Sequence, residues 1–413
     1  MKHFFLLCTF FGVFVSLSAQ TKISVSVTNP SKTVRNDQPV VIPLENYGDV
    51  RSARVSFGDD AFEGNDIPCQ LDDLDQDEIF DELCFLADLK PRQTKTYTVT
   101  FYDAGEPREY ESRVYAEMLM RNDKVKEKNR HDNFIESITA RGDCANPYNL
   151  QHHHGVDFES ELNGIRIYFD KRQTVDIYGK FKKRLELKET QFYTTADQKK
   201  QNYGDDVLWV GNTFGLGAFR GWDGFEPTMV EPVKSRTQRI ISYGPLRTIV
   251  EVIDRGWKAD ASLPPVNMTL RYTQYAGHRD TDVEVLFNRE MKDYTFSTGL
   301  INVKDSREFS DHSGLRACWG TDYPSTDTLK WNRETVGLAI LVPDRYIKSE
   351  EPANKDNYTF LVNMLGYGME YKICYCSANE EFGFHSADEW FKWLEEWKKE
   401  VEKPVIVKLE AKK

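Results

Sequence analysis

The sequence lacks the short motifs that define several large enzyme classes. It contains no GxSxG, no P-loop, no dinucleotide-binding fingerprint and no CxxCH, the motifs typical of α/β serine hydrolases, of P-loop and dinucleotide-binding enzymes and of c-type cytochromes. Positive charge is also in deficit, because 66 Asp and Glu face 54 Lys and Arg and give a net charge of −12. A nucleic acid attracted by bulk electrostatics is therefore not expected as a partner.

Long apolar runs are missing after the first twenty residues. No later segment approaches the roughly 18 apolar residues that a membrane-spanning helix needs. Residues 1–20 combine Lys2, an apolar run and small residues up to Ala19, a pattern typical of a cleaved secretory signal peptide. We therefore expect a soluble periplasmic or secreted protein without a membrane span, cleaved near Ala19 or Gln20.

Cysteine is scarce for an exported chain, with six left after the signal segment. Cys69 and Cys84 flank an acidic loop and could form a disulfide, whereas Cys374 and Cys376 would project side by side from one strand. Spacing alone fixes neither pair. The CxC sequence has no second close-spaced Cys or His pair, so it does not resemble a zinc site.

Short alternating runs separated by turn residues dominate the rest of the sequence. Residues 21–105 predict a small β-sandwich, 106–148 a polar connecting region, and 149–413 a large antiparallel β-domain. Strands and helices do not alternate, which excludes a parallel doubly wound sheet, and no fixed-period repeat occurs, which disfavours a propeller. One amphipathic helix is predicted over 387–402, with Ser386 as its N-cap and an edge strand after it.

The stretch from Asn149 to Lys180 is the most informative, because it gathers three histidines and many charged residues. Alternate strand residues share a face, so Arg166, Tyr168 and Asp170 are expected to point together. Ionisable groups on a strand face are satisfied by each other or by a ligand. The pattern therefore fits an ion-pair network or, as we favour, a sugar site.

An acidic loop offers a weak match to a calcium-binding loop. Its aspartates fall at positions 1, 3, 5 and 9 of the template, but Glu78 and Cys84 stand where the template has Gly and Glu. A solvated acidic loop explains the pattern better than a calcium site. The candidate calcium ligands are Asp73, Asp75, Asp77 and Asp81.

Four longer strings carry a family resemblance. They are PCQLDDLDQDEIFDELCFLADLKP, HHHGVDFESELNGIRIYFDKRQTVDIYGK, GDDVLWVGNTFGLG and RYTQYAGHRD. Over most of its length the chain resembles an exported family of unknown function from bacterial polysaccharide-utilisation systems. The resemblance implies the antiparallel β-supersandwich of galactose mutarotase-like proteins, a scaffold that also carries polysaccharide lyases. Fold analogy alone does not select a reaction.

Elimination across C4 and C5 of a uronic acid fits these residues best. A base must remove the C5 proton, an acid must protonate the leaving oxygen, and a cation must neutralise the carboxylate. If the 4-hydroxyl leaves, the enzyme is an oligosaccharide dehydratase, and otherwise it is a polysaccharide lyase. The expected catalytic residues are His153, His154, Tyr168 and Tyr178. The expected substrate-binding residues are Arg166, Lys180, Glu159, Glu161, His278, Arg279 and Trp222.

Two other functions remain open from the sequence. A glycoside hydrolase would use Glu159 with Glu161 or Asp280, although adjacent glutamates on one strand face cannot flank a scissile bond. A non-catalytic carbohydrate-binding protein would stack sugars on exposed aromatic rings. No cofactor is assigned, but a divalent metal ion becomes credible if His278 and one of the three clustered histidines converge with a carboxylate.

Overall fold

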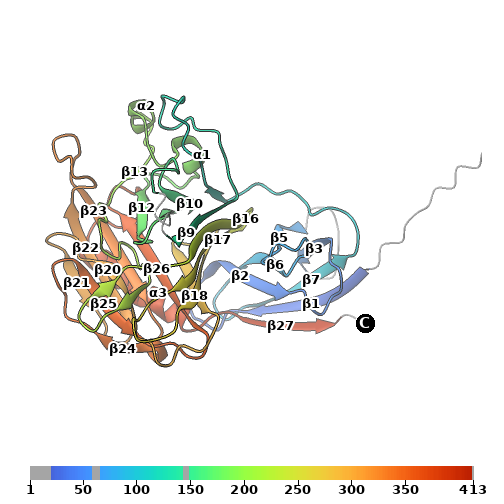
Figure 1. Cartoon of the computed structure of the whole chain (residues 1–413). Coiled ribbons are helices and arrows are strands. Elements are labelled where there is room, and N and C mark those ends of the chain that lie inside the picture. The colour runs from blue at the N-terminus through green and yellow to red at the C-terminus, as the bar shows by residue number, and fades with distance from the viewer. Residues whose placement is uncertain (1–19, 58–65, 143–147, 412–413) are drawn as a thin grey trace, which may run out of the picture.

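The computed structural model describes residues 20–57, 66–142 and 148–411, and Figure 1 shows a small sandwich beside a larger β-body. Nearly all elements are strands in antiparallel sheets, which confirms the predicted all-β sandwich-like fold. The predicted signal segment lies outside the described residues except for Gln20, and so does Cys144. Within the described ranges, no helix is long and apolar enough to cross a membrane.

Two small sheets form the N-terminal sandwich. Alternate residues such as Ile23, Val25 and Val27 point into a shared core, as expected for a strand with one buried face. The first sheet runs β27 (Ile406–Ala411), β1 (Gln20–Thr28), β7 (Thr94–Tyr102), β3 (Ser52–Phe57) and β4 (Asp66–Ile67). The second runs β2 (Arg35–Pro43), β6 (Glu82–Leu89) and β5 (Cys69–Asp72).

Three sheets form the larger body around one extensive core. The first is a nine-stranded sheet of β21 (Arg307–Ser310), β22 (Leu315–Asp322), β23 (Glu334–Leu341), β26 (Gly368–Ser377), β19 (Asp280–Phe287), β18 (Val266–Tyr275), β17 (Arg247–Trp257), β16 (Ser235–Tyr243) and β9 (Ser137–Arg141). The second comprises β15 (Pro227–Thr228), β14 (Arg220–Trp222), β20 (Phe296–Ile301), β25 (Asn357–Val362) and β24 (Ile347–Glu350), the last preceded by a 3-10 turn over Asp344–Tyr346.

The third sheet carries the polar stretch singled out in the sequence. Its order is β13 (Asp205–Asp206), β12 (Val175–Gly179), β11 (Gly164–Tyr168), β10 (Gly155–Ser160) and β8 (Val114–Glu117). One face packs into the main core through apolar residues such as Val156, Phe158 and Ile165. The segment with the short helices α1 (Leu187–Thr190) and α2 (Ala196–Lys200) lies beside this sheet (Figure 1).

The C-terminal helix α3 (Ala387–Val401) matches its prediction closely. Ser386 caps it by accepting a hydrogen bond from the backbone N–H of Glu389. Its apolar face packs against β22 and β23, where Trp390 and Leu394 are fully buried. Strand β27 follows and pairs antiparallel with β1 at the sheet edge. The C-terminal end of the chain therefore completes the N-terminal sandwich.

A buried ion pair joins the sandwich to the larger body. Arg247 at the start of β17 binds Asp72 at 2.7 Å and Glu82 at 2.6 Å, both from the sandwich. Gln70 adds hydrogen bonds to the backbone of Arg247. Because a buried charge must be paired to be tolerated, these contacts fix how the two parts meet.

The described cysteines are all buried free thiols, including Cys69 and Cys84. Cys374 and Cys376 lie on β26 beneath helix α3. Burial raises the pKa of the Cys69 thiol to about 11, so it is a packing residue without thiolate character.

Candidate active site

A row of charged side chains crosses the third sheet from strand to strand. Glu117 stands opposite Asp157, Asp157 opposite Arg166, and Arg166 opposite Asp176. Directly paired residues of antiparallel strands project to the same face. All four side chains are buried, so this face is covered and its charges must satisfy one another or a bound group.

Arg166 is the cationic centre of this row. It forms ion pairs with Asp176 and, at 3.2 Å, with Asp206. Its guanidinium also lies 4.0 Å from the centre of the Phe192 ring, and the Arg166 side chain is buried away from solvent. The Tyr168 hydroxyl donates a hydrogen bond of 2.8 Å to the same Asp176 carboxylate. Arg166 and Tyr168, expected in substrate binding and catalysis, are thus engaged with internal partners.

Lys180 and Glu159 form a closed buried pair. The Lys180 ammonium donates to Glu159 at 2.6 Å and to the carbonyls of Ser160 and Arg184 at 2.7 Å each. These three bonds use all three donors of the ammonium group. Glu159 also accepts the backbone N–H groups at the start of α1. Both side chains are fully buried, so they anchor α1 and leave nothing to contact a substrate.

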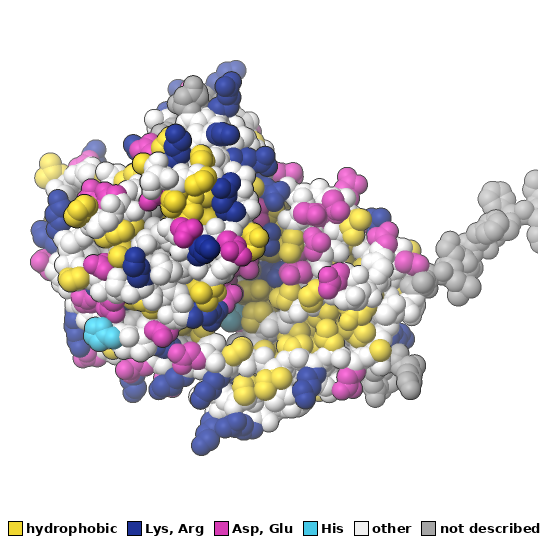
Figure 2. Space-filling model, turned by 60° about the horizontal axis from the view of Figure 1, so that its bottom comes forward, with side chains coloured by type: hydrophobic (Ala, Val, Ile, Leu, Met, Phe, Trp, Pro, Cys, Tyr) yellow, Lys and Arg dark blue, Asp and Glu magenta, His cyan; other side chains and the backbone are white. Residues whose placement is uncertain are grey.

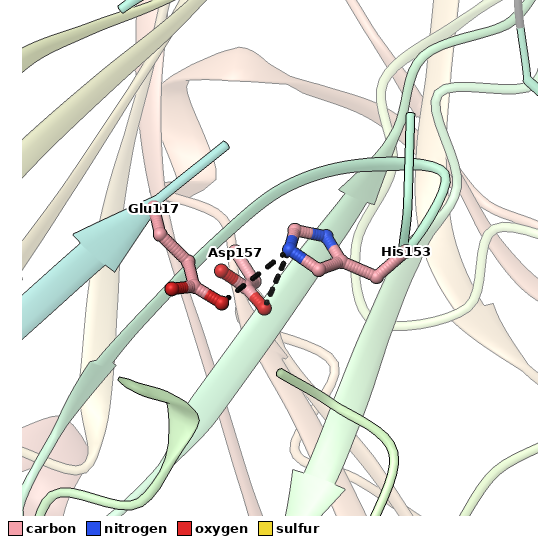
Figure 3. Close-up of side chains that lie close together, drawn as sticks. All are labelled: Glu117, His153 and Asp157. Atoms are coloured by element: carbon pink, nitrogen blue, oxygen red, sulfur yellow. Dashed lines mark ion pairs between the residues drawn. The ribbon is translucent and has the colours of Figure 1, made fainter. Parts of the chain in front are cut away.

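The His153 ring faces two carboxylates at the end of the charged row, as Figure 3 shows. Its Nε2 is 3.5 Å from Glu117 Oε1 and 3.5 Å from Asp157 Oδ2. All three side chains have no exposed surface. Burial lowers the pKa of His153 to about 3 and raises that of Glu117 to about 8. His153 is consequently closed off from any saccharide.

A pocket of about 390 Å³ opens beside this row. His152 stacks on His131 with ring centres 3.8 Å apart, and its ring lies 5.4 Å from that of Tyr193. His154, which is half-buried, stacks on Tyr148 at 3.8 Å. The pocket is lined by Arg121, Asn122, Asp123, Val125, Lys126, Lys128, His131, His152, His154 and Tyr193.

The protonation state of His154 suits proton abstraction. Burial lowers the pKa of this ring to about 4, so it is neutral at physiological pH. Its Nδ1 lies 2.8 Å from the Tyr148 carbonyl oxygen, to which only a protonated nitrogen can donate. The lone pair then resides on Nε2, which is free to accept a proton.

The other expected site residues lie apart from this pocket. Tyr178 is buried and donates its hydroxyl to the Gly204 carbonyl at 2.7 Å. Glu161 leaves the face of Glu159 and binds Arg113 at 2.5 Å. Arg279 pairs with Glu380 at 2.8 Å. Trp222 is on β14, in a different sheet.

The acidic loop between β5 and β6 uses its aspartates to hold its own backbone. Asp73 accepts the backbone N–H groups of Gln76 and Glu78, and Asp81 accepts that of Leu74. Asp73, Asp75 and Asp81 have carboxylate oxygens within 4.8 Å of one another. Such turns form without an ion, so the calcium hypothesis remains a prediction.

A family model described as a domain of unknown function (DUF4861) matches residues 27–407. The chain belongs to this family. A search of curated proteins gave no match. Membership of DUF4861 extends over almost the whole described chain, but the description of the family names no activity.

Two solved structures from Enterococcus faecalis resemble this DUF4861 chain. One is an alpha-mannosidase from strain V583, with 11% identity and a TM-score of 0.49, covering 95% of this chain and 46% of its own. The other is a protein in glycosyl hydrolase family 38, with 10% identity and a TM-score of 0.49, covering 94% and 47%. The chain spans about half the length of either protein. Likeness at this level assigns no reaction to DUF4861.

Sequence reasoning missed several residues that line the histidine pocket. Lys126 and Lys128 belong to the stretch that we interpreted as a polar connection, and Tyr193 lies within 149–413, where no site was predicted after Lys180 until Trp222. Glu117 carried no signal of its own, because a lone glutamate after apolar residues is common. A cluster of basic residues followed by His131 was the available signal for the pocket rim.

A second hollow lies between the sandwich and the nine-stranded sheet, on the face turned forward in Figure 2. A cavity of about 760 Å³ there shares Tyr275 and Lys372 with an adjoining one of about 660 Å³. Its charges are largely paired, for example Lys372 with Asp282 and Arg345 with Glu370. Paired charges leave little for a charged ligand, so the histidine pocket is the better candidate.

His278 connects the two walls of that hollow and predicts a pH dependence of stability. It lies 2.8 Å from the Asp37 carbonyl oxygen and 3.3 Å from Asp280. Burial opposes protonation, but Asp280 and the Asp37 backbone outweigh it and raise the pKa of His278, despite Lys372 nearby. Only the protonated ring can donate to both partners at once.

The stabilisation by His278 should be complete below about pH 6.5, the unfolded value, and should be lost as the pH rises through the raised folded pKa. Denaturant unfolding of wild type and His278→Asn from pH 5 to 9 measures this. We expect a difference of about 2 kcal/mol at pH 5, typical of hydrogen bonds to a charged group, that shrinks on the alkaline side. A difference that is constant with pH would contradict the assignment.

Proposed function

We propose that the protein catalyses β-elimination on a uronic-acid-containing oligosaccharide in the histidine pocket. One observation carries this proposal: His154 and Tyr193 line the same pocket, whose rim bears three cationic side chains. The cations are Arg121, which is paired with Asp123, and Lys126 and Lys128, which leave the lining of the pocket with a net positive charge. A locally positive rim attracts an anionic sugar even though the whole chain is negative, because charges act over about 8–10 Å at physiological salt.

The reaction needs a base and an acid, and the pocket offers both. Nε2 of His154 takes the C5 proton, the electrons of that C–H bond form the C4=C5 double bond, and the C4–O bond breaks. Tyr193 donates its phenolic proton to the departing oxygen. Burial raises the pKa of Tyr193, so the phenol is protonated at neutral pH. Exchange with water returns both groups to their starting states.

The cationic rim supplies the remaining requirement. Removal of the C5 proton spreads negative charge onto the sugar carboxylate, and a positive group beside it lowers the barrier. Lys128 is well placed for this, since its ammonium lies 5.3 Å from the centre of the Tyr193 ring. Arg166 and Lys180, the cations expected from the sequence, have internal partners instead.

A glycoside hydrolase fits the pocket less well. Hydrolysis of a glycosidic bond commonly uses two carboxyl groups on opposite sides of the sugar. Among the described residues that line the pocket, Asp123 alone has a carboxylate, and it is paired with Arg121 at 3.0 Å. Glu159 is buried against Lys180. The geometry therefore favours elimination.

The product distinguishes the proposed function from its alternatives. Incubation with uronic-acid-containing oligosaccharides should produce a near-ultraviolet absorbance, because the new double bond is conjugated with the carboxylate. Mass spectrometry then separates the two forms of elimination: a dehydratase product has lost one water from an uncut chain, and a lyase product is a pair of fragments. New reducing ends without absorbance would indicate hydrolysis, and unchanged sugar that binds would indicate a carbohydrate-binding protein; either result overturns the proposal.

A further inference from the structure

We infer that Glu117, His153 and Asp157 bind a divalent transition-metal ion such as Zn²⁺. This inference concerns metal binding and stability, so it holds whether or not the proposed function is right. Glu117 and Asp157 are directly opposed on β8 and β10, and His153 lies in the turn that leads into β10 (Figure 3). The three side chains point toward one common space.

The first argument is the number of buried polar atoms without partners. Five side-chain atoms in the cluster make no hydrogen bond to the described residues: Glu117 Oε1, both ring nitrogens of His153 and both carboxylate oxygens of Asp157. Nearly all buried polar groups in proteins are hydrogen-bonded, because an unpartnered one costs about 1–3 kcal/mol. Three such side chains facing one another indicate that a bound group completes the site.

The second argument is spacing. His153 Nε2 lies 3.5 Å from each carboxylate, which is long for a hydrogen bond. Four ligands at about 2.1 Å in tetrahedral geometry place neighbouring ligand atoms about 3.4 Å apart, as in zinc sites. The separation is therefore that of atoms around a shared metal ion.

The third argument is charge and ligand type. Two carboxylates and a neutral imidazole compensate a doubly charged cation, and a ligand set that includes imidazole suits zinc, iron or copper better than calcium or magnesium. Tyr115 provides the outer contact that such sites require, since its hydroxyl donates to Glu117 Oε2 at 2.6 Å. That bond holds Glu117 so that Oε1 faces the cluster.

A metal here would stabilise the wall of the histidine pocket. The His152 ring, which lines the pocket, lies 5.6 Å from that of His153, and His154 follows with a left-handed backbone of φ +70°. A metal ion that holds His153 in place would also hold this turn, and therefore the two pocket histidines His152 and His154. The closed environment implies that the ion is taken up as the strands and their cover fold together.

Metal binding can be measured directly on the full chain. The protein is unfolded with a chelator, then refolded with or without Zn²⁺, and bound metal is counted by mass spectrometry alongside the melting temperature. We expect one Zn²⁺ per chain and a higher melting temperature with metal. Glu117→Gln and Asp157→Asn should each weaken Zn²⁺ binding by more than about 100-fold, since even outer-shell partners contribute about 10- to 100-fold. Asp75→Asn, in the acidic loop, is the control and should bind Zn²⁺ like wild type.

Anomalous diffraction at the zinc edge from wild-type crystals keeps the inference testable if a variant fails to fold. A peak between His153, Glu117 and Asp157 would support it. An anomalous peak at the acidic loop alone, or an unchanged stoichiometry in Asp157→Asn, would overturn it. So would equal melting temperatures and no retained metal after refolding.

Discussion

Replacing Lys180 by Met is expected to lower the free energy of unfolding by about 3–5 kcal/mol, because removing one partner of a buried ion pair leaves the other charge uncompensated. The remaining Glu159 carboxylate would be fully buried beside the backbone N–H groups of α1. Burial already raises the pKa of Glu159 to about 6 with Lys180 in place. Urea unfolding at pH 7 followed by circular dichroism measures the loss.

The double variant Lys180→Met with Glu159→Gln should recover much of this stability, since the neutral amide carbonyl can still accept from the start of α1. Lys182→Met, at an exposed position two residues away, is the matched control and should change stability by less than about 0.5 kcal/mol. If Lys180→Met were as stable as wild type but bound substrate more weakly, Lys180 would be a substrate ligand and not a structural cation.

His154→Asn is expected to reduce the rate of elimination by about 100-fold or more, the usual contribution of a general base. Asparagine tolerates the left-handed backbone at this position, so the fold should persist. The drop should appear in kcat more than in KM, because the base acts in the transition state. Initial rates of product absorbance over a substrate series would provide both constants.

His312→Asn serves as the control for this experiment, because the His312 side chain is 81% exposed and does not line the histidine pocket. It should retain the wild-type rate. Full activity of His154→Asn would exclude His154 as the base, and His152, on the same pocket wall, would then be the next variant to measure.

The fold class could be predicted because its signals are local. Alternation of apolar and polar residues marks strands such as β1 and β18 without reference to the rest of the chain. Helix α3 was also predictable, since its cap at Ser386 and its apolar stripe ending near Val401 lie within sixteen residues. These features depend on neighbours in sequence, which is the information that a single sequence contains.

Helix α1 is an element that the local sequence does not predict. Leu187 lies within 149–413, which was predicted as an antiparallel β-domain, and this prediction was wrong at this point because Leu187–Thr190 is helical. The first backbone N–H groups there are bound by Glu159, 27 and 28 residues earlier in the chain. A carboxylate near the N-terminus of a helix stabilises the helix. Here the carboxylate comes from a distant strand, so the contact depends on the tertiary structure and cannot be inferred from the local sequence.

The candidate site, too, could be predicted only in part from the sequence. The sequence drew attention to the stretch that contains His154, because a cluster of ionisable residues can be recognised from the sequence alone. It could not separate Arg166 or Lys180 from substrate ligands, because a buried ion pair and a binding site use the same residue types. Only their partners in space, Asp176 and Glu159, distinguish the two cases.

The pairing of β27 with β1 has a consequence for handling the protein. All six residues of β27 are exposed, whereas β1 is hydrogen-bonded along both edges, to β27 and to β7. Removing the last strand would therefore bare a row of backbone donors and acceptors along β1, which is a template for joining another molecule edge to edge. Shortened forms should self-associate, and an affinity tag would be better placed after residue 413 than substituted for the strand.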